Sequence, residues 1–275
     1  MKKKESTPMK KIIAIALTLV LCIGLLAGCG SAEDEKVIKV AASPTPHSWI
    51  LKTATEVLAE EGWTLEVIEY SDYVVPNNVV DDGEVDANYF QHTPYLDTFN
   101  AENGTKLVAV AEIHYEPFAL YPGTKVKMEE LTTGDKIAVP NDGSNRARAL
   151  MLLESAGLIT LAEGVGMQAT ILDIVENPKG LQIVEMEAAQ IDGVRDSVAM
   201  AVINGNYALQ AGLFAGTDGI VSEDAGNATV YTNVLVVKEG NENSEKTKAL
   251  IAALQSDAVK AYIESTFPGS VVPCF

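Results

Sequence analysis

Short apolar runs of strand length alternate with helical patterns along this chain, and this alternation limits the folds it can adopt more than any other feature. The expected strands are apolar and cover residues 37–42, 65–70, 107–112, 137–140, 200–203 and 230–238. Helices are expected from Thr45 and Pro46 to Gly62, from 146 to 156 and from 244 to 263, where apolar residues recur at helical spacing. Strands that alternate with helices are typical of βαβ units, so we predict an α/β fold with mainly parallel sheets.

The length of the chain favours two lobes. Its 275 residues are enough for two domains of roughly 100–150 residues each. The segment 115–123 is where we expect the chain to cross from one lobe to the other, and 230–238 is where it returns. We therefore predict that residues 37–118 and 232–275 form lobe 1 and that residues 119–231 form lobe 2.

The first 28 residues have the pattern of an export signal. Lysines follow Met1, and an apolar run from 12 to 28 leads to Cys29 through Leu-Ala-Gly. A basic start, an apolar middle and small residues at the end are typical of a secretory signal peptide. The run is slightly shorter than the roughly 20 residues of a membrane-spanning helix. We therefore expect residues 1–28 to be cleaved.

The Leu-Ala-Gly-Cys ending resembles the bacterial lipobox, in which the cysteine is acylated and becomes the mature N-terminus. This resemblance implies that Cys29 is the lipidation site and that residues 29–36 are a polar tether. Acyl chains would anchor the protein to the cell membrane on its extracytoplasmic face.

Composition excludes several function classes. The formal net charge is −18, from 20 Lys and Arg against 38 Asp and Glu, which disfavours nucleic-acid binding because phosphates require a basic surface. Of the three cysteines, Cys22 leaves with the signal and Cys29 takes the lipid, so Cys274 has no partner within the chain. The sequence has no Gly-x-Ser-x-Gly motif and no Cys/His pair at zinc spacing. We therefore expect no catalytic activity, no metal site and no cofactor.

Aromatic and polar side chains collect after the expected strands, which is where ligands bind in open α/β sheets. These candidate site residues are Tyr73, Phe90, His92, Tyr95, Asn145, Arg148 and Asn204. A guanidinium offers paired donors to a carboxylate, asparagine can accept from an ammonium group, and aromatic walls suit an apolar or thioether side chain. Each residue taken singly is more typical of a core or surface position. Together they indicate a site for a free α-amino acid with a non-polar side chain.

Six stretches of the chain carry a more specific pattern. They are AASPTPH at 41–47, YSDYVVPN at 70–77, GEVDANYFQHTPYL at 83–96, IAVPNDGSNRARAL at 137–150, ILDIVENPKGLQIVE at 171–185 and AVINGNYAL at 201–209. They resemble the NlpA-type lipoproteins, the methionine-binding components of bacterial methionine ABC importers. The resemblance covers nearly all of the mature chain.

This resemblance implies a two-lobed periplasmic-binding-protein fold of type II that closes over L-methionine in a cleft between its lobes. It also implies delivery of the ligand to a membrane permease driven by a separate ATPase subunit. Carried over by motif, Tyr73, Phe90, His92 and Tyr95 would surround the methionine side chain. Arg148 would bind the carboxylate and Asn204 the amino and carboxylate groups, with Asn145 beside them.

Three alternatives remain open at this point. The ligand could be another amino acid or a methionine-containing dipeptide. A surface-displayed lipoprotein could also serve as an adhesin. An enzyme would have to use the histidines, and His114 and Glu116 lie close together in the expected crossing segment.

Overall fold

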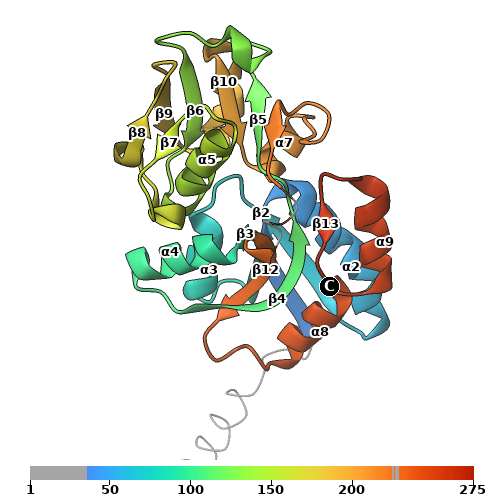
Figure 1. Cartoon of the computed structure of the whole chain (residues 1–275). Coiled ribbons are helices and arrows are strands. Elements are labelled where there is room, and N and C mark those ends of the chain that lie inside the picture. The colour runs from blue at the N-terminus through green and yellow to red at the C-terminus, as the bar shows by residue number, and fades with distance from the viewer. Residues whose placement is uncertain (1–35, 225, 227–228) are drawn as a thin grey trace, which may run out of the picture. The chain divides into compact units, whose positions relative to one another are not determined.

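The computed structural model describes residues 36–224, 226 and 229–275, so the expected signal peptide, Cys29 and nearly all of the tether lie outside the described residues. The described fold is built on two mixed β-sheets, one of six strands and one of five (Figure 1). Among the described residues, no helix combines the length and the hydropathy needed to cross a membrane.

The six-stranded sheet has the order β13-β4-β12-β3-β1-β2. Its strands are β1 (Val37–Ala42), β2 (Thr64–Glu69), β3 (Ala87–His92), β4 (Leu107–Tyr115), β12 (Thr232–Lys238) and β13 (Val272–Pro273). Successive side chains of a strand point to opposite faces of a sheet. In this sheet, helices pack on both faces. Val40 and Ala42 share a core with α2 (Trp49–Glu60), α8 (Glu245–Leu254) and α9 (Asp257–Thr266). Ala41, between them, packs with α3 (Val75–Asp81) and α4 (Thr93–Asn103).

The five-stranded sheet has the order β11-β5-β10-β6-β9. Its strands are β5 (Ala119–Pro122), β6 (Lys136–Pro140), β9 (Gln182–Met186), β10 (Met200–Ile203) and β11 (Val221–Ser222). The long helix α5 (Gly143–Ser155) packs on one face, and the short helices α6 (Ile191–Val194) and α7 (Gly205–Gln210) pack on the other. The strands β7 (Thr160–Leu161) and β8 (Ile174–Glu176) form a separate two-stranded ribbon.

The chain passes between the two sheets through short segments. It leaves the six-stranded sheet at the end of β4, and after Glu116, Pro117 and Phe118 it enters the five-stranded sheet as β5. It comes back as β12, which lies between β3 and β4. Both passages therefore run beside the carboxyl end of β3, and they bring residues distant in sequence to one place. There Asn233, near the start of β12, is the register partner of His92.

All six strands expected from the sequence are present, with ends that differ by at most three residues. The prediction of mainly parallel sheets was wrong. β1 and β3 are parallel, as are β6 and both of its neighbours, but β12 is antiparallel to β3 and to β4, and β5 is antiparallel to β10. The direction of β12 follows from the chain path. It returns from the five-stranded sheet at the edge where β3 ends, so it runs in the opposite direction to β3.

Three local predictions also need correction. The stretch 87–92 was expected to lie after a strand, but it is itself the strand β3, and all six of its residues are buried. Its polar residues hid the apolar pattern that marks the other strands. The helix expected over 244–263 is two helices, since Ser256 caps a new one by accepting a hydrogen bond from the N–H of Val259. The helix expected from 146 begins at Gly143, and the side chain of Asp142 caps it by accepting a hydrogen bond from the N–H of Asn145.

One close backbone approach gives a test of this packing. A Cβ atom on Gly123 would lie 2.5 Å from the carbonyl oxygen of Arg195 and closer still to that of Val198. Because backbone atoms cannot turn aside as a side chain can, we expect Gly123→Ala to lower the free energy of unfolding by roughly 1–3 kcal/mol, the usual cost of overpacking. Urea unfolding of the purified protein measures this loss.

The matched control is Gly193→Ala, since a Cβ atom on Gly193 in helix α6 would meet nothing within 4 Å. That variant should be as stable as the wild type or slightly more stable, because alanine favours a helix. Equal stabilities for the two variants would contradict this account of Gly123.

Candidate ligand-binding site

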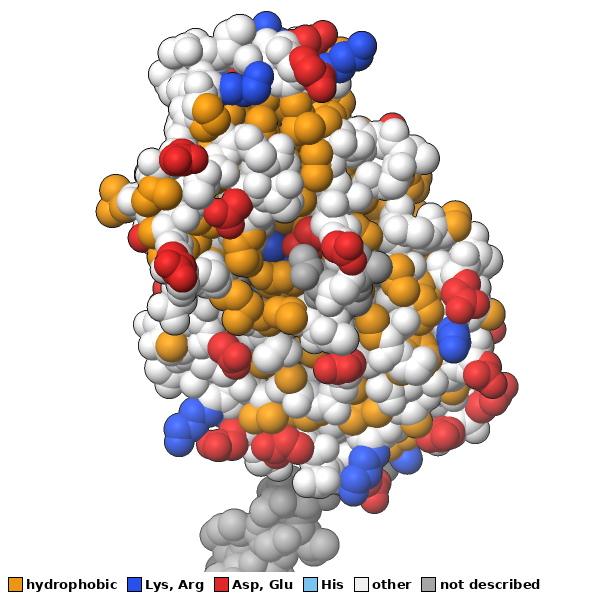
Figure 2. Space-filling model, in the orientation of Figure 1, with side chains coloured by type: hydrophobic (Ala, Val, Ile, Leu, Met, Phe, Trp, Pro, Cys, Tyr) orange, Lys and Arg blue, Asp and Glu red, His pale blue; other side chains and the backbone are white. Residues whose placement is uncertain are grey.

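A pocket lies at the ends of the strands, between the six-stranded and the five-stranded sheet. Its lining combines aromatic and polar side chains from both parts of the fold: Tyr73, Phe90, Gln91, His92, Tyr95, Glu116, Asn145, Arg148, Asn204, Gly205, Asn206 and Asn233. All seven candidate residues from the sequence are among them. The surface of this part of the molecule is hollowed, with apolar side chains around the hollow (Figure 2).

One wall of the pocket is aromatic. The ring of Tyr73 lies 5.8 Å from that of Phe90 and 5.6 Å from that of Tyr95, measured between centroids. The hydroxyl groups point to partners, since Tyr95 donates to the carbonyl oxygen of Tyr73 at 3.0 Å and Tyr73 donates to the side chain of Asn206. With their polar atoms bonded, the rings present apolar surface. Such a wall suits a flexible apolar or thioether group.

A chain of amides forms the second wall. The side-chain oxygen of Asn145 accepts from His92 Nε2 at 3.1 Å and from Asn204 Nδ2 at 3.0 Å. Its own Nδ2 donates to the Asp142 carboxylate. Asn145 is therefore fully engaged by protein groups, and its effect is to orient His92 and Asn204.

Asn204 differs from Asn145 in one respect. Its Oδ1 is buried and has no hydrogen-bond partner among the described residues. A buried acceptor without a partner costs roughly 1–3 kcal/mol, so such an atom at a pocket wall points to a donor supplied by a ligand. Asn204 stands immediately before α7, where the chain turns out of β10.

His92 is a neutral donor in this wall. Its Nδ1 accepts from the backbone N–H of Tyr95 at the start of α4, so its Nε2 carries the proton that it donates to Asn145. Burial, and then the positive charge of Arg148, lower the pKa of His92 to about 3. The imidazole is therefore uncharged at neutral pH.

Arg148 supplies the positive charge of the pocket, and it is held firmly. Its Nε donates to Glu223 Oε1 at 2.8 Å, and its Nη2 donates to Glu223 Oε2 at 2.5 Å and to the carbonyl oxygen of Glu116 at 3.0 Å. The rings of Tyr231 and Phe118 lie 4.1 and 4.7 Å from its central carbon. The guanidinium also lines the pocket, where it can meet a ligand carboxylate.

The structure thus brings together every site residue that the sequence indicated inside the described part of the chain. It adds Glu223, which positions Arg148, and the pocket residues Gln91, Glu116, Gly205, Asn206 and Asn233. No sequence signal marked Glu223, because its partner is 75 positions away. Asn206 could have been found, since it follows the strand 200–203 as Asn204 does.

Two α/β lobes with a buried, polar and aromatic pocket at the strand ends define a solute-binding protein of the two-lobed class. The family model described as NlpA lipoprotein matches residues 38–275. The chain belongs to the NlpA lipoprotein family, as its sequence motifs predicted. Members of this family bind and deliver substrates for ABC transporters and are not enzymes, so the alternative of an enzyme is set aside.

The sequence matches to known relatives cover nearly the whole chain. The methionine-binding lipoprotein MetQ of Bacillus subtilis is 42% identical over 275 residues, which cover 96% of this chain and 99% of that protein. The D-methionine-binding lipoprotein MetQ of Escherichia coli is 41% identical over 251 residues, 90% of this chain and 92% of that protein. A solved nutrient-binding protein from Burkholderia cenocepacia, bound to methionine, is 41% identical with a TM-score of 0.83, and the match covers 86% of this chain and all of that one.

The buried pair of Arg148 and Glu223 yields a stability prediction. Glu223→Gln removes the charge that faces a guanidinium whose side chain is 5% exposed. Breaking a buried pair leaves an uncompensated charge, so we expect a loss of about 3–5 kcal/mol in the free energy of unfolding, measured with urea.

Glu185→Gln is the control, because it removes one partner of the half-buried pair with Arg146, where side-chain exposure is 27% and 24%. It should cost less than about 1 kcal/mol. An equally small effect of both substitutions would show that Glu223 does not hold Arg148 as described.

The low pKa of His92 predicts a dependence of stability on pH. Because its folded-state pKa of about 3 lies below the unfolded value near 6.5, the unfolded chain takes up this proton first as the pH falls. Stability is therefore full above pH 6.5 and is lost below it. Between pH 7 and pH 5, His92 alone should cost the native state about 2 kcal/mol.

The variant His92→Asn tests this contribution, since asparagine can still cap α4 but does not titrate. Urea unfolding of both proteins at pH 7 and pH 5 should show a smaller acid-induced loss in the variant. The same loss in both proteins would mean that His92 titrates normally in the folded state.

Proposed function

We propose that this protein captures L-methionine, or a close relative of it, and delivers it to a methionine ABC permease driven by a separate ATPase. The observation that carries this proposal is the buried Oδ1 of Asn204, which has no partner in the part of the chain that the structure describes and lies in the same pocket as the Arg148 guanidinium. An acceptor and a cation in one pocket match the ammonium and carboxylate groups of a free amino acid. The protein performs no chemical step on this ligand.

The polar end of the ligand would be held by two residues of the five-stranded lobe. Asn204 Oδ1 accepts from the α-ammonium group, which satisfies the buried acceptor. The Arg148 guanidinium donates to the carboxylate, while Glu223 keeps the guanidinium plane in place. Asn145 orients Asn204 and His92, which form the wall beside the ligand.

The apolar end would lie on the aromatic wall of the six-stranded lobe. Tyr73, Phe90 and Tyr95 present ring surface there, and a thioether sulfur gains roughly 0.3–1.5 kcal/mol from each aromatic contact. The names of the relatives from B. subtilis and E. coli, and the methionine bound to the Burkholderia protein, support methionine as the ligand.

Binding would couple the two lobes, for which we propose residues 37–118 with 232–275 and residues 119–231. The aromatic residues come from the first group and Asn145, Arg148 and Asn204 from the second. A ligand that contacts both lobes binds a closed arrangement more tightly than an open one and so shifts the population toward closure. A permease can then distinguish the loaded protein from the empty one.

The N-terminal sequence supports a place for this activity. We propose that Cys29 carries the lipid after cleavage of residues 1–28, and that residues 29–36 tether the protein to the extracytoplasmic face of the cell membrane. The mature body is acidic, and Asp and Glu side chains outnumber Lys and Arg on the face shown in Figure 2. Such a surface favours a soluble body and disfavours nucleic acid as a partner.

Calorimetry with the mature lipoprotein in detergent, stripped of carried-over ligand, tests the proposal. We expect L-methionine to bind at one site and Arg148→Ala to cost roughly 2–5 kcal/mol of binding free energy, because the ligand carboxylate loses its partner. Asn204→Ala should also weaken binding, by roughly 1–3 kcal/mol. Arg146→Ala is the control, since Arg146 lies on the same helix but outside the pocket lining.

The other outcomes are distinct. Binding of D-methionine, another amino acid or a methionine dipeptide alone would keep the transport role and change the ligand. Near-normal binding by Arg148→Ala would overturn the carboxylate assignment. Absence of binding by every amino acid would favour a surface interaction instead.

A further inference from the structure

Two tyrosines join the proposed lobes beside the ligand pocket. Tyr73 lies in the segment after β2, and Tyr207 lies on α7. Tyr73 Oη donates to the side-chain oxygen of Asn206, and Tyr207 Oη donates to the backbone carbonyl oxygen of Ser71 at 2.9 Å. Each lobe thus supplies one donor and one acceptor. The two ring centroids lie 5.1 Å apart, so the side chains form a continuous contact between the lobes.

The segment 71–74 is fixed on its own lobe. The Asp72 carboxylate accepts from the backbone N–H of Val74 at 2.7 Å and from that of the next residue at 2.8 Å. The Tyr95 hydroxyl donates to the carbonyl oxygen of Tyr73 at 3.0 Å. These bonds define the turn, so the groups that meet the other lobe are held in position.

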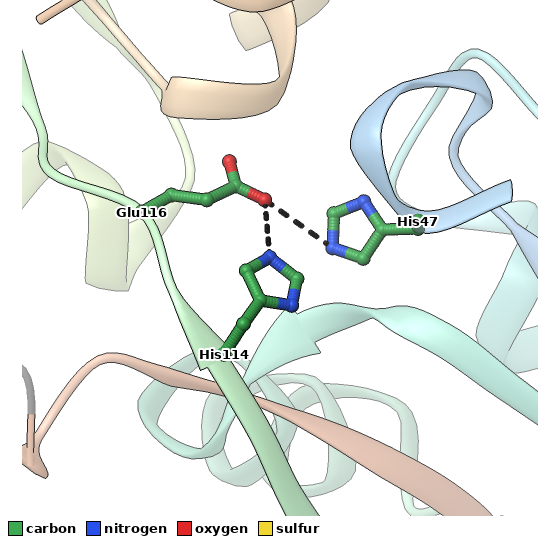
Figure 3. Close-up of side chains that lie close together, drawn as sticks. All are labelled: His47, His114 and Glu116. Carbon is green, nitrogen blue, oxygen red and sulfur yellow. Dashed lines mark hydrogen bonds and ion pairs between the residues drawn. The ribbon is translucent and has the colours of Figure 1, made fainter. Parts of the chain in front are cut away.

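Helix α7 is fixed where it begins, against the passage between the sheets. A Cβ atom on Gly205 would lie 2.6 Å from Glu116 Cβ, so the backbone of the helix lies directly on Glu116. The Glu116 carboxylate in turn lies 2.7 Å from His114 Nε2 and 3.5 Å from His47 Nε2 (Figure 3). Tyr207 is buried in the first turns of the same helix. Its position is therefore set by the passage at which the lobes meet.

The tyrosine pair lies between two cavities. Tyr73 and Tyr95 line the ligand pocket and also a second cavity, which Tyr207 lines together with the acidic side chains of Asp72 and Glu187. The shared rings form the boundary between the two cavities. A separation of the lobes that breaks the bonds of Tyr73 and Tyr207 therefore also opens the pocket on this side.

The two hydroxyl groups can act as donors at any physiological pH. Burial raises the pKa of Tyr73 and that of Tyr207 above the usual value of tyrosine, so both stay protonated. Hydrogen bonds that form only when the lobes are together stabilise the closed arrangement relative to an open one. In an open arrangement the same groups bond to water, so each bond adds a modest net free energy.

We propose that Tyr207 and Tyr73, with the Ser71 carbonyl and the Asn206 side chain, form a latch that determines how fast the bound ligand leaves. This inference rests on the proposed function, since it requires a small ligand held between the lobes. Tyr207 is a positioning residue, because it lies outside the pocket lining and acts through closure of the lobes. Its bond has no local sequence pattern, since the acceptor is a backbone oxygen 136 positions away.

The test uses the mature lipoprotein in detergent, stripped of carried-over ligand and loaded with radiolabelled L-methionine. Tyr207→Phe keeps the ring and removes only the hydroxyl. A chase with excess unlabelled L-methionine should show a dissociation rate constant about 2- to 12-fold higher than in the wild type, the range that one net hydrogen bond supplies. The association rate constant, obtained from the dissociation rate constant and the calorimetric Kd, should stay within about 2-fold of the wild-type value, because changes of this kind act mainly on dissociation.

Tyr121→Phe is the matched control. Tyr121 is buried in β5, and its hydroxyl has no hydrogen-bond partner in the part of the chain that the structure describes. The variant therefore loses a buried tyrosine hydroxyl without losing a bond, and it should release L-methionine at the wild-type rate. A role of Tyr207 in stability alone would lower the free energy of unfolding in urea and leave the dissociation rate constant unchanged.

Each outcome decides the proposal. An unchanged dissociation rate constant in Tyr207→Phe, an equal rise in Tyr121→Phe, or a loss of affinity that lies in the association rate constant overturns the latch. If the wild-type protein does not bind L-methionine, the proposed ligand fails instead, and small-angle X-ray scattering of the ligand-free protein decides on the latch. The double variant Tyr73→Phe/Tyr207→Phe should then have a larger radius of gyration than the wild type, because the lobes lose both bonds, and equal radii overturn the latch.

Discussion

The buried pair between Arg148 and Glu223 is the interaction on which the rest of the site depends. The Glu223 carboxylate accepts from two nitrogens of Arg148, from the Tyr115 hydroxyl and from the backbone N–H of Phe118. One acidic group thus connects helix α5 to both ends of the passage between the sheets. Its burial makes these bonds strong and makes their loss costly. The orientation of the guanidinium in the pocket lining is a consequence of that constraint.

The residues of this site have two different roles. Some hold other side chains in position, and others are available to contact a ligand. Asn145 and Glu223 make their hydrogen bonds to other protein groups. Asn145 thereby holds Asn204 in place, and Glu223 holds Arg148. Asn204 Oδ1 has no hydrogen-bond partner within the described structure, and Arg148 supplies the positive charge of the pocket lining. Because the supporting residues are already fully bonded, few groups need to be ordered when a ligand arrives, which lowers the entropic cost of binding.

Glu116 links this pocket to two buried histidines, His47 and His114. It lines the pocket, its backbone oxygen accepts from Arg148, and its carboxylate faces His47 and His114. The two passages between the lobes meet here, since Glu116 lies in one and Asn233 stands just inside the other.

The sequence by itself determined the α/β class, six of the strands and the seven candidate residues that line the pocket, because these follow from local patterns and from polar residues placed after strands. It also determined the NlpA family through motifs such as DANYFQH. Only the tertiary structure decided that β12 runs antiparallel, that Glu223 holds Arg148 and that His47 meets Glu116. These depend on partners far apart in the chain, 75 positions in the case of Arg148 and Glu223. Hydrogen-bond partners of this kind are set by how the sheets and passages meet, and no local pattern records them.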